Sequence, residues 1–83
     1  MNVTLSKAAT KVLGSVDKRT QQRLRQALER IPLGDVKPLN GKNPLFRLRV
    51  GAWRVVFFYV DIDAIVVARI ASRGDVYKGG LLH

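Results

Sequence analysis

Three arginines lie within eight positions of one another in the stretch LFRLRVGAWRVVFF, which runs from Leu45 to Phe58. Arg47, Arg49 and Arg54 alternate with apolar residues on both sides of a Gly-Ala step. Arginine keeps its charge at any accessible pH, and its planar fork can donate two parallel hydrogen bonds to one phosphate group. If the fold gathers these side chains on one surface, that surface can bind a phosphate.

The Gly-Ala step predicts such a surface. Glycine at the first central position of a two-residue connection is typical of a type II′ turn, so Gly51 and Ala52 predict a β-hairpin. In this register Arg49 stands opposite Arg54. Because opposed residues of an antiparallel pair project to the same side, the arginines share one face of the sheet. The other face is apolar and consists of Phe46, Leu48, Val50, Trp53, Val55, Phe57 and Tyr59.

A third strand should follow the turn in Asp61-Ile62-Asp63-Ala64. A loop with an even number of residues there places Arg69 and Arg73 on the arginine side, and a bulge would invert the assignment. Ile65, Val67 and Ala71 would then share the arginine side, and Ala64, Val66, Ala68 and Ile70 would extend the apolar face.

Like charges placed opposite one another destabilise a sheet, so the arginines need an anion. Asp61 and Asp63 fall at the far turn, and Asp75 lies toward the C-terminus. We therefore expect that the sheet does not neutralise the cluster and that an external phosphate does. The alternative is a row of arginines lying over an exposed sheet face without a ligand.

The composition favours a polyanionic partner. The 83 residues include 15 Lys and Arg against 6 Asp and Glu, which gives a formal net charge of +9. Nucleic acid or the ribosome fits this charge, and a large acidic protein competes for the same signal. There is no cysteine and no apolar run near the roughly 20 residues of a membrane span, and the first residues lack the apolar core expected of a signal peptide. We expect a cytoplasmic protein that does not bind membranes.

The pattern predicts one domain, residues 1–83, of the α+β class. Val3 and Leu5 indicate a short strand, after which Ser6 can cap a helix that ends near Gly14. A second helix over 17–31 ends before Pro32. Its polar face is expected to be solvated and carries Lys18, Arg19, Arg23, Arg25 and Arg30.

Residues 32–44 read as a connection rich in proline, glycine and asparagine, and β-rich runs follow at about 45–50, 53–60 and 64–71. We therefore expect a short N-terminal strand, a two-helix hairpin and a three-strand antiparallel meander. Together these would form a twisted sheet with the helices on one face.

The segment from residue 37 to 78, KPLNGKNPLFRLRVGAWRVVFFYVDIDAIVVARIASRGDVYK, resembles the RelE/ParE superfamily of bacterial toxins from type II toxin–antitoxin modules, specifically the RelE side. The resemblance rests on the Leu-Asn-Gly element, on the arginine-rich hairpin with its aromatic residues, and on the ending Arg-Gly-Asp-Val-Tyr-Lys. The preceding two-helix hairpin fits the same family.

The resemblance implies a ribosome-dependent mRNA endoribonuclease that works without metal or another cofactor. In that family the 2′-hydroxyl attacks the adjacent phosphate and leaves a 2′,3′-cyclic phosphate and a 5′-hydroxyl. By similarity Arg54 and Arg73 would hold the scissile phosphate, Tyr77 would stack on a base, orient the nucleophile or anchor the fold, and Arg47 and Arg49 would contact phosphates or assist proton transfer. Implied partners are a cognate antitoxin, the ribosome and mRNA, and a toxin–antitoxin hetero-oligomer is a further possibility.

The chain departs from parts of this pattern. Some relatives carry lysines at Arg47 and Arg49, and arginine is a poor general base because it hardly deprotonates. Others have a histidine where Ser72 stands. Two alternatives therefore remain open: a ParE-type toxin that inhibits DNA gyrase, and a catalytically weak member that acts mainly with its antitoxin. His83 and the turn residues Asp61 and Asp63 are weaker candidates for a site.

Overall fold

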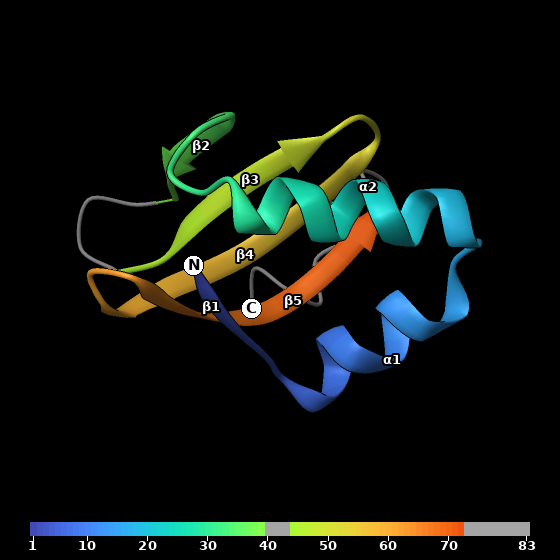
Figure 1. Ribbon diagram of the computed structural model, residues 1–83, viewed down its shortest axis with the longest axis horizontal. Coiled ribbons are helices and arrows are strands. Elements are labelled where there is room, and N and C mark those ends of the chain that lie inside the picture. Colours follow the sequence, from blue (N-terminus) through green and yellow to red (C-terminus); the bar gives the residue numbers. More distant parts are fainter. Residues whose placement is uncertain (40–43, 73–83) are drawn as a thin grey trace.

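The computed structural model describes residues 1–39 and 44–72 (Figure 1). Its elements are β1 (Asn2–Leu5), α1 (Lys7–Ser15), α2 (Lys18–Glu29), β2 (Asp35–Pro38), β3 (Phe46–Val50), β4 (Trp53–Asp61) and β5 (Ala64–Ser72). The five described strands form one sheet in the order β1-β5-β4-β3-β2. β1 runs parallel to β5, and the other pairs are antiparallel. The predicted α+β class is confirmed, with a mixed sheet.

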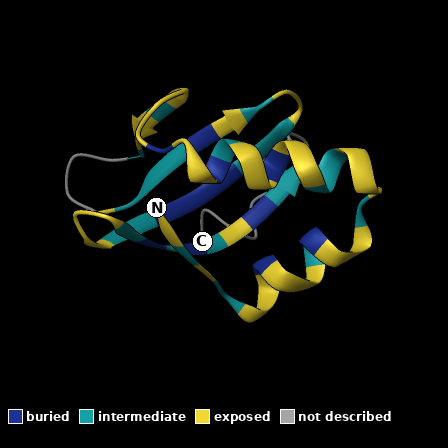
Figure 2. Ribbon diagram, in the orientation of Figure 1, coloured by how far each residue is buried: buried dark blue, intermediate teal, exposed yellow. Residues whose placement is uncertain are grey.

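The core lies between the two helices and one face of the sheet (Figure 2). Ala9 and Leu13 of α1 and Leu24 and Leu28 of α2 are buried there. The facing sheet residues are buried as well, and Phe57 is 0% exposed at the centre. Burying a side chain of this size stabilises the fold by about 2–3 kcal/mol. The sheet contributes Leu48, Val55, Phe57, Ile65, Val67 and Ile70 to this core.

Both helices begin at side-chain caps, which explains where they start. The Ser6 hydroxyl accepts a hydrogen bond from the Ala9 N–H at 3.0 Å and donates one to the Ala68 carbonyl at 2.7 Å, so the cap also ties α1 to β5. At the start of α2, Asp17 accepts hydrogen bonds from the side chain and the backbone of Thr20. These bonds hold the pKa of the Asp17 carboxyl below its ordinary value.

The β3–β4 hairpin has the predicted register. Arg49 pairs with Arg54, Leu48 with Val55 and Phe46 with Phe57. Gly51 has a φ of +60°, and no described residue other than glycine has a positive φ. A positive φ at the first central position only is the type II′ geometry. The apolar face predicted from this register is therefore confirmed, and its rings are in contact, with the Phe46 and Phe57 centroids 5.7 Å apart.

The prediction for β5 is correct near the hairpin turn and wrong in its first half. Arg69 pairs with Val56 and Ala71 with Arg54, so both lie on the arginine side, and Ile70 is buried on the other. The register then shifts at two places. Val60 in β4 and Ala68 in β5 are the extra residues at these irregularities, and a single extra residue reverses which face its neighbours point to.

The two shifts cancel each other in the pairing register, and the part of β5 before Ala68 is inverted relative to the prediction. Ile65 and Val67 pair with Tyr59 and Phe57 and are 0% exposed in the core, contrary to the prediction that they lie beside the arginines. Val66 instead pairs with Phe58 on the outer face. Ala64 and Ala68 likewise do not extend the apolar face, because Ala68 is the extra residue at one shift and Ala64 alternates with the buried Ile65; neither belongs to the core.

The interpretation of residues 32–44 as a plain connection is also wrong in part. Residues Asp35–Pro38 form β2, which pairs antiparallel with β3 and makes the outer edge of the sheet. Of its four residues only Val36 is partly buried against the core. One apolar residue is too weak a signal for a period-two pattern, so the strand depends on the tertiary pairing.

Candidate phosphate-binding site

Four arginines lie on the outer face of the sheet, opposite the helices. They are Arg47 and Arg49 of β3, Arg54 of β4 and Arg69 of β5, and we call them the arginine face. Arg49 and Arg54 are direct cross-strand neighbours, and Val56 lies between Arg47 and Arg69. With adjacent strands about 4.8 Å apart, the arginine face spans roughly 10 Å across the sheet.

The four side chains differ in how freely they can move. Arg47 keeps only 16% of its side chain exposed, and Arg54 is half-buried. Arg49 and Arg69 are exposed. Val56, between Arg47 and Arg69, is itself 2% exposed, so the middle of this face is covered. The side chains of Arg47 and Arg54 are therefore held in place, whereas those of Arg49 and Arg69 can adjust to a ligand.

β2 adds two charged residues to the arginine face that the sequence did not reveal. Asp35 pairs with Arg49 and Lys37 with Arg47, so both side chains lie on the outer side. The Asp35 Oδ1 atom is 3.6 Å from Nη1 of Arg47. The sheet therefore contains one counter-charge, Asp35, that the sequence did not reveal.

Asp35 reduces the positive charge of this surface without cancelling it. In the described part of the chain, the arginine face and Lys37 together provide five cations against the single carboxylate of Asp35. Asp35 is also 44% exposed, which weakens its pull on Arg47. A surface with this excess of arginine attracts phosphate groups and can hold them with paired hydrogen bonds.

Other predicted site residues are placed as follows. Ser72 pairs with Trp53, so it points to the helix side of the sheet, away from the arginine face. Trp53 and Phe57 belong to the core, as expected. Arg73, Tyr77, Asp75 and His83 lie outside the described residues. The charged residues of α2 are exposed, as predicted for a solvated face.

The chemistry available on the arginine face is binding and charge stabilisation. Guanidinium groups can stabilise negative charge that develops on the non-bridging oxygens of a phosphate. They do not accept protons at neutral pH, so a proton acceptor must come from elsewhere.

Within the described residues, no helix is long and apolar enough to cross a membrane.

Comparison with known structures supports the fold. The chain is similar to a chain of the RelB–RelE antitoxin–toxin complex of Methanococcus jannaschii, with 24% identity, a TM-score of 0.71 and coverage of 90% of this chain and 95% of that one. The RelBE2 toxin–antitoxin complex of Mycobacterium tuberculosis gives 24% identity and a TM-score of 0.71, over 87% of this chain and 96% of that chain. The RelE–RelB complex of Pyrococcus horikoshii gives 30% identity and a TM-score of 0.66, over 88% and 94%.

Comparison of the sequence alone identifies the family. A search against curated proteins finds no significant match. The model of the family described as ParE toxin of type II toxin–antitoxin system matches residues 3–77, which include every strand and helix from the second residue of β1 to the end of β5. The resemblance seen in the hairpin motif is thereby confirmed, and the chain belongs to the ParE toxin family of type II toxin–antitoxin systems, within the RelE/ParE superfamily.

Proposed function

We propose that this toxin is a ribosome-dependent mRNA endoribonuclease of the RelE kind, which acts in the cytoplasm and is neutralised by a cognate antitoxin. The observation that carries the proposal is the arginine face, where Arg47, Arg49, Arg54 and Arg69 outnumber the one carboxylate of Asp35. Such a surface suits the phosphates of a single RNA strand. The RelE structures that the chain resembles support the same choice.

In this proposal the 2′-hydroxyl oxygen of one nucleotide attacks the adjacent phosphorus. The bond from phosphorus to the 5′ oxygen breaks, and that oxygen leaves with a proton as a 5′-hydroxyl, while the other product keeps a 2′,3′-cyclic phosphate. Arg54, together with Arg73, holds the phosphate and stabilises the charge on its non-bridging oxygens. Arg47, Arg49 and Arg69 bind neighbouring phosphates, and Tyr77 stacks on a base or orients the nucleophile.

The proton transfers are the part of this reaction for which the protein offers the fewest suitable side chains. Positions 47 and 49 carry arginine, which is a poor general base. Ser72 points away from the arginine face. We infer that the proton acceptor belongs to the ribosome, which would also make cleavage depend on it.

A second candidate function is inhibition of DNA gyrase. The observation that favours it is the family match itself, which is to the ParE toxins rather than to a RelE family. The two functions make different demands on the arginine face. A nuclease needs its arginines to converge on one phosphate, whereas an inhibitor needs an intact contact surface.

The test is to map mRNA 5′ ends after brief induction in a bacterium without the antitoxin. The native chain is compared with Arg54→Ala and Arg73→Ala, and with Arg19→Ala on the exposed side of α2 as a control of equal charge change. The proposal predicts cuts inside translated codons that disappear in the first two variants and persist in the third. Growth arrest with intact transcripts would instead favour gyrase, and normal growth would favour an inactive member.

A further inference from the structure

We propose that Phe58, on the outer face of the sheet, is a platform on which a purine base of the RNA stacks, with Thr4 at the edge of that base. The proposal rests on the proposed function, because it names the base that the toxin would prefer beside the phosphates on the arginine face. Stacking on an aromatic ring is a common way in which proteins hold the bases of single-stranded RNA. The other aromatic residues in the described part of the chain lie on the core side of the sheet.

The alternation of β4 puts Phe58 on the same face as the arginines. Arg54, Val56 and Phe58 follow one another at intervals of two residues, so their side chains point to one side of the sheet. At about 3.4 Å per residue, the ring lies about 14 Å along the strand from Arg54 and about 7 Å from Val56. An RNA strand that runs along β4 therefore meets the arginines first and the ring next.

Phe58 takes no part in the ring contacts of the core. Phe46, Phe57 and Tyr59 contact one another there, whereas Phe58 makes no ring contact with another described aromatic residue. Phe58 is half-buried, and neither it nor its partner Val66 belongs to the core cluster. A base can therefore contact this ring without any change in the core.

A row of three side chains crosses the sheet at the level of this ring. Thr4 of β1 pairs with Val66 of β5, and Val66 pairs with Phe58 of β4, so all three lie on the outer face. Thr4 is exposed, whereas its neighbours Val3 and Leu5 pack against the core. Two strand spacings, about 10 Å, separate Thr4 from Phe58. The threonine hydroxyl can donate a hydrogen bond to the edge of a base or accept one from it.

The width of this row favours a purine. The two fused rings of a purine can cover both Phe58 and the aliphatic Val66, which brings a base edge with hydrogen-bonding groups toward Thr4. A single pyrimidine ring on Phe58 covers less of Val66 and leaves the threonine hydroxyl to water. Differences in stacking strength produce modest base preferences of this kind.

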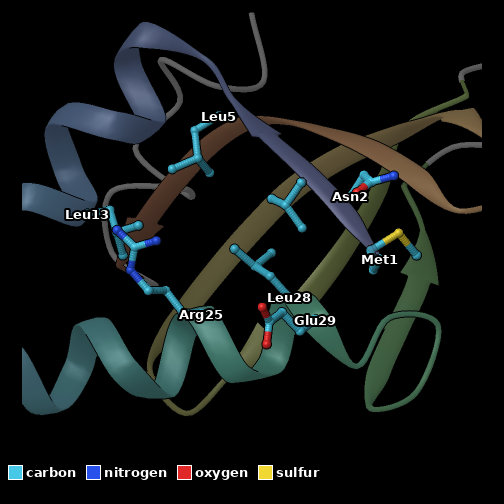
Figure 3. Close-up of a pocket in the computed structure, with 8 residues that line it drawn as sticks. Met1, Asn2, Leu5, Leu13, Arg25, Leu28 and Glu29 are labelled. Atoms are coloured by element: carbon cyan, nitrogen blue, oxygen red, sulfur yellow. The ribbon is translucent and has the colours of Figure 1, made fainter.

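The cavities on the helix side of the sheet offer no comparable platform. One of about 240 Å³ lies between β1, α1 and α2, and Figure 3 shows aliphatic side chains and the charged groups of Arg25 and Glu29 around it. Another, of about 330 Å³, lies between α2 and β3. No aromatic ring is among the described residues that line either cavity. Arg25→Ala therefore serves as a control that lowers the net charge without touching the outer face.

The experiment measures binding of three fluorescein-labelled probes by fluorescence anisotropy: hexa-adenosine, hexa-uridine and an abasic ribose-phosphate chain of the same length. We expect the native protein to bind hexa-adenosine more tightly than hexa-uridine. Phe58→Leu should weaken binding of hexa-adenosine about tenfold and leave that of the abasic chain within about twofold, since leucine is apolar but has no ring. Phe58→Tyr should stay within about twofold of the native protein, and Thr4→Val should weaken binding of hexa-adenosine about threefold.

Two controls separate the ring from the fold and from the net charge. Phe46→Leu removes an aromatic ring from the opposite face of the sheet, and Arg25→Ala removes a positive charge from α2. Both should bind every probe within about twofold of the native protein. Arg69→Ala should weaken binding of all three probes by a similar factor, because it removes a phosphate contact. Circular dichroism establishes that each variant is folded.

Three results would overturn the platform: an unchanged affinity of Phe58→Leu for hexa-adenosine, an equal loss of affinity for the abasic chain, or an equal loss in Phe46→Leu. Equal binding of hexa-adenosine and hexa-uridine by the native protein would overturn the assignment of a purine. These measurements need neither ribosomes nor cleavage, so the platform can stand if the nuclease assignment fails. A toxin that cuts mRNA equally well and at the same sites with Phe58→Leu would keep the proposed function and lose the platform.

Discussion

Replacing Asp35 by asparagine should lower the stability of the fold and raise its affinity for RNA at the same time. The carboxylate lies 3.6 Å from Nη1 of Arg47, whose side chain is 16% exposed. At an effective dielectric constant near 20, two unit charges at this distance attract each other by about 5 kcal/mol before solvation costs. Because Asp35 is 44% exposed, solvent screens most of this, and the net loss should be about 1 kcal/mol. For a domain of this size that corresponds to a melting temperature about 4–8 °C lower.

The effect on RNA should have the opposite sign. Asp35 stands opposite Arg49, so a phosphate bound there would lie about 7 Å from the carboxylate, and removing that repulsion gains roughly 0.6 kcal/mol in water. This is about a threefold tighter Kd at low salt, and the gain should fade above about 0.15 M salt as the charges are screened. The assays are thermal denaturation and anisotropy with a uridine oligonucleotide across salt concentrations. Unchanged or weaker RNA binding by Asp35→Asn would refute the placement of phosphates on the arginine face.

Three other substitutions, two of them compared with a matched control variant, test the fold that positions this face. Gly51→Ala should lower the free energy of unfolding in urea by about 1–2 kcal/mol, because Gly51 has a φ of +60° and a Cβ there would lie 3.1 Å from Nη2 of Arg23. Gly14→Ala in α1 should be neutral or stabilising, since a Cβ on Gly14 would meet nothing within 4 Å. Similar effects at both sites would contradict the turn geometry. Phe57→Ala should lower the free energy of unfolding by about 3–5 kcal/mol, since the ring is fully buried. Phe58→Ala, on the outer face, should lower it clearly less. Equal losses of stability would contradict the strand register. Asp17→Ala should lower the melting temperature at neutral pH. Because the Thr20 hydrogen bonds lower the Asp17 pKa from 3.8, that difference should be fully present above about pH 5 and disappear as the pH falls below 3.8; a difference independent of pH would argue against a charged cap.

The sequence was sufficient for the part of the fold that local rules determine. Gly51 and Ala52 set the hairpin register, and that register alone placed Arg47, Arg49 and Arg54 on one face opposite the ring of Phe57. Ser6 and Pro32 likewise marked a helix start and a helix end. In each case one residue type has a strong conformational preference that its surroundings did not override.

The features that the sequence did not reveal depend on tertiary pairing. The extra residues Val60 and Ala68 carry no signal of their own, because an alanine or valine in a strand is compatible with regular pairing. β2 was missed because Val36 is its one residue packed on the core, and with it the charges of Asp35 and Lys37 were missed. The position of the Arg23 guanidinium beside Gly51 depends on how α2 crosses the sheet, which periodicity does not specify.

The central claim, that the arginine face holds the phosphate of an RNA cleavage site, is tested most directly with purified toxin and ribosomes programmed with a defined mRNA. Single-turnover cleavage is measured for the native chain, Arg54→Ala, Arg54→Lys and the control Arg19→Ala, after circular dichroism has established that each variant is folded. We predict products ending in a 2′,3′-cyclic phosphate, a rate about 10²–10³-fold lower for Arg54→Ala, partial recovery with Arg54→Lys, and a native rate for Arg19→Ala. Cleavage by Arg54→Ala at the native rate would contradict the claim.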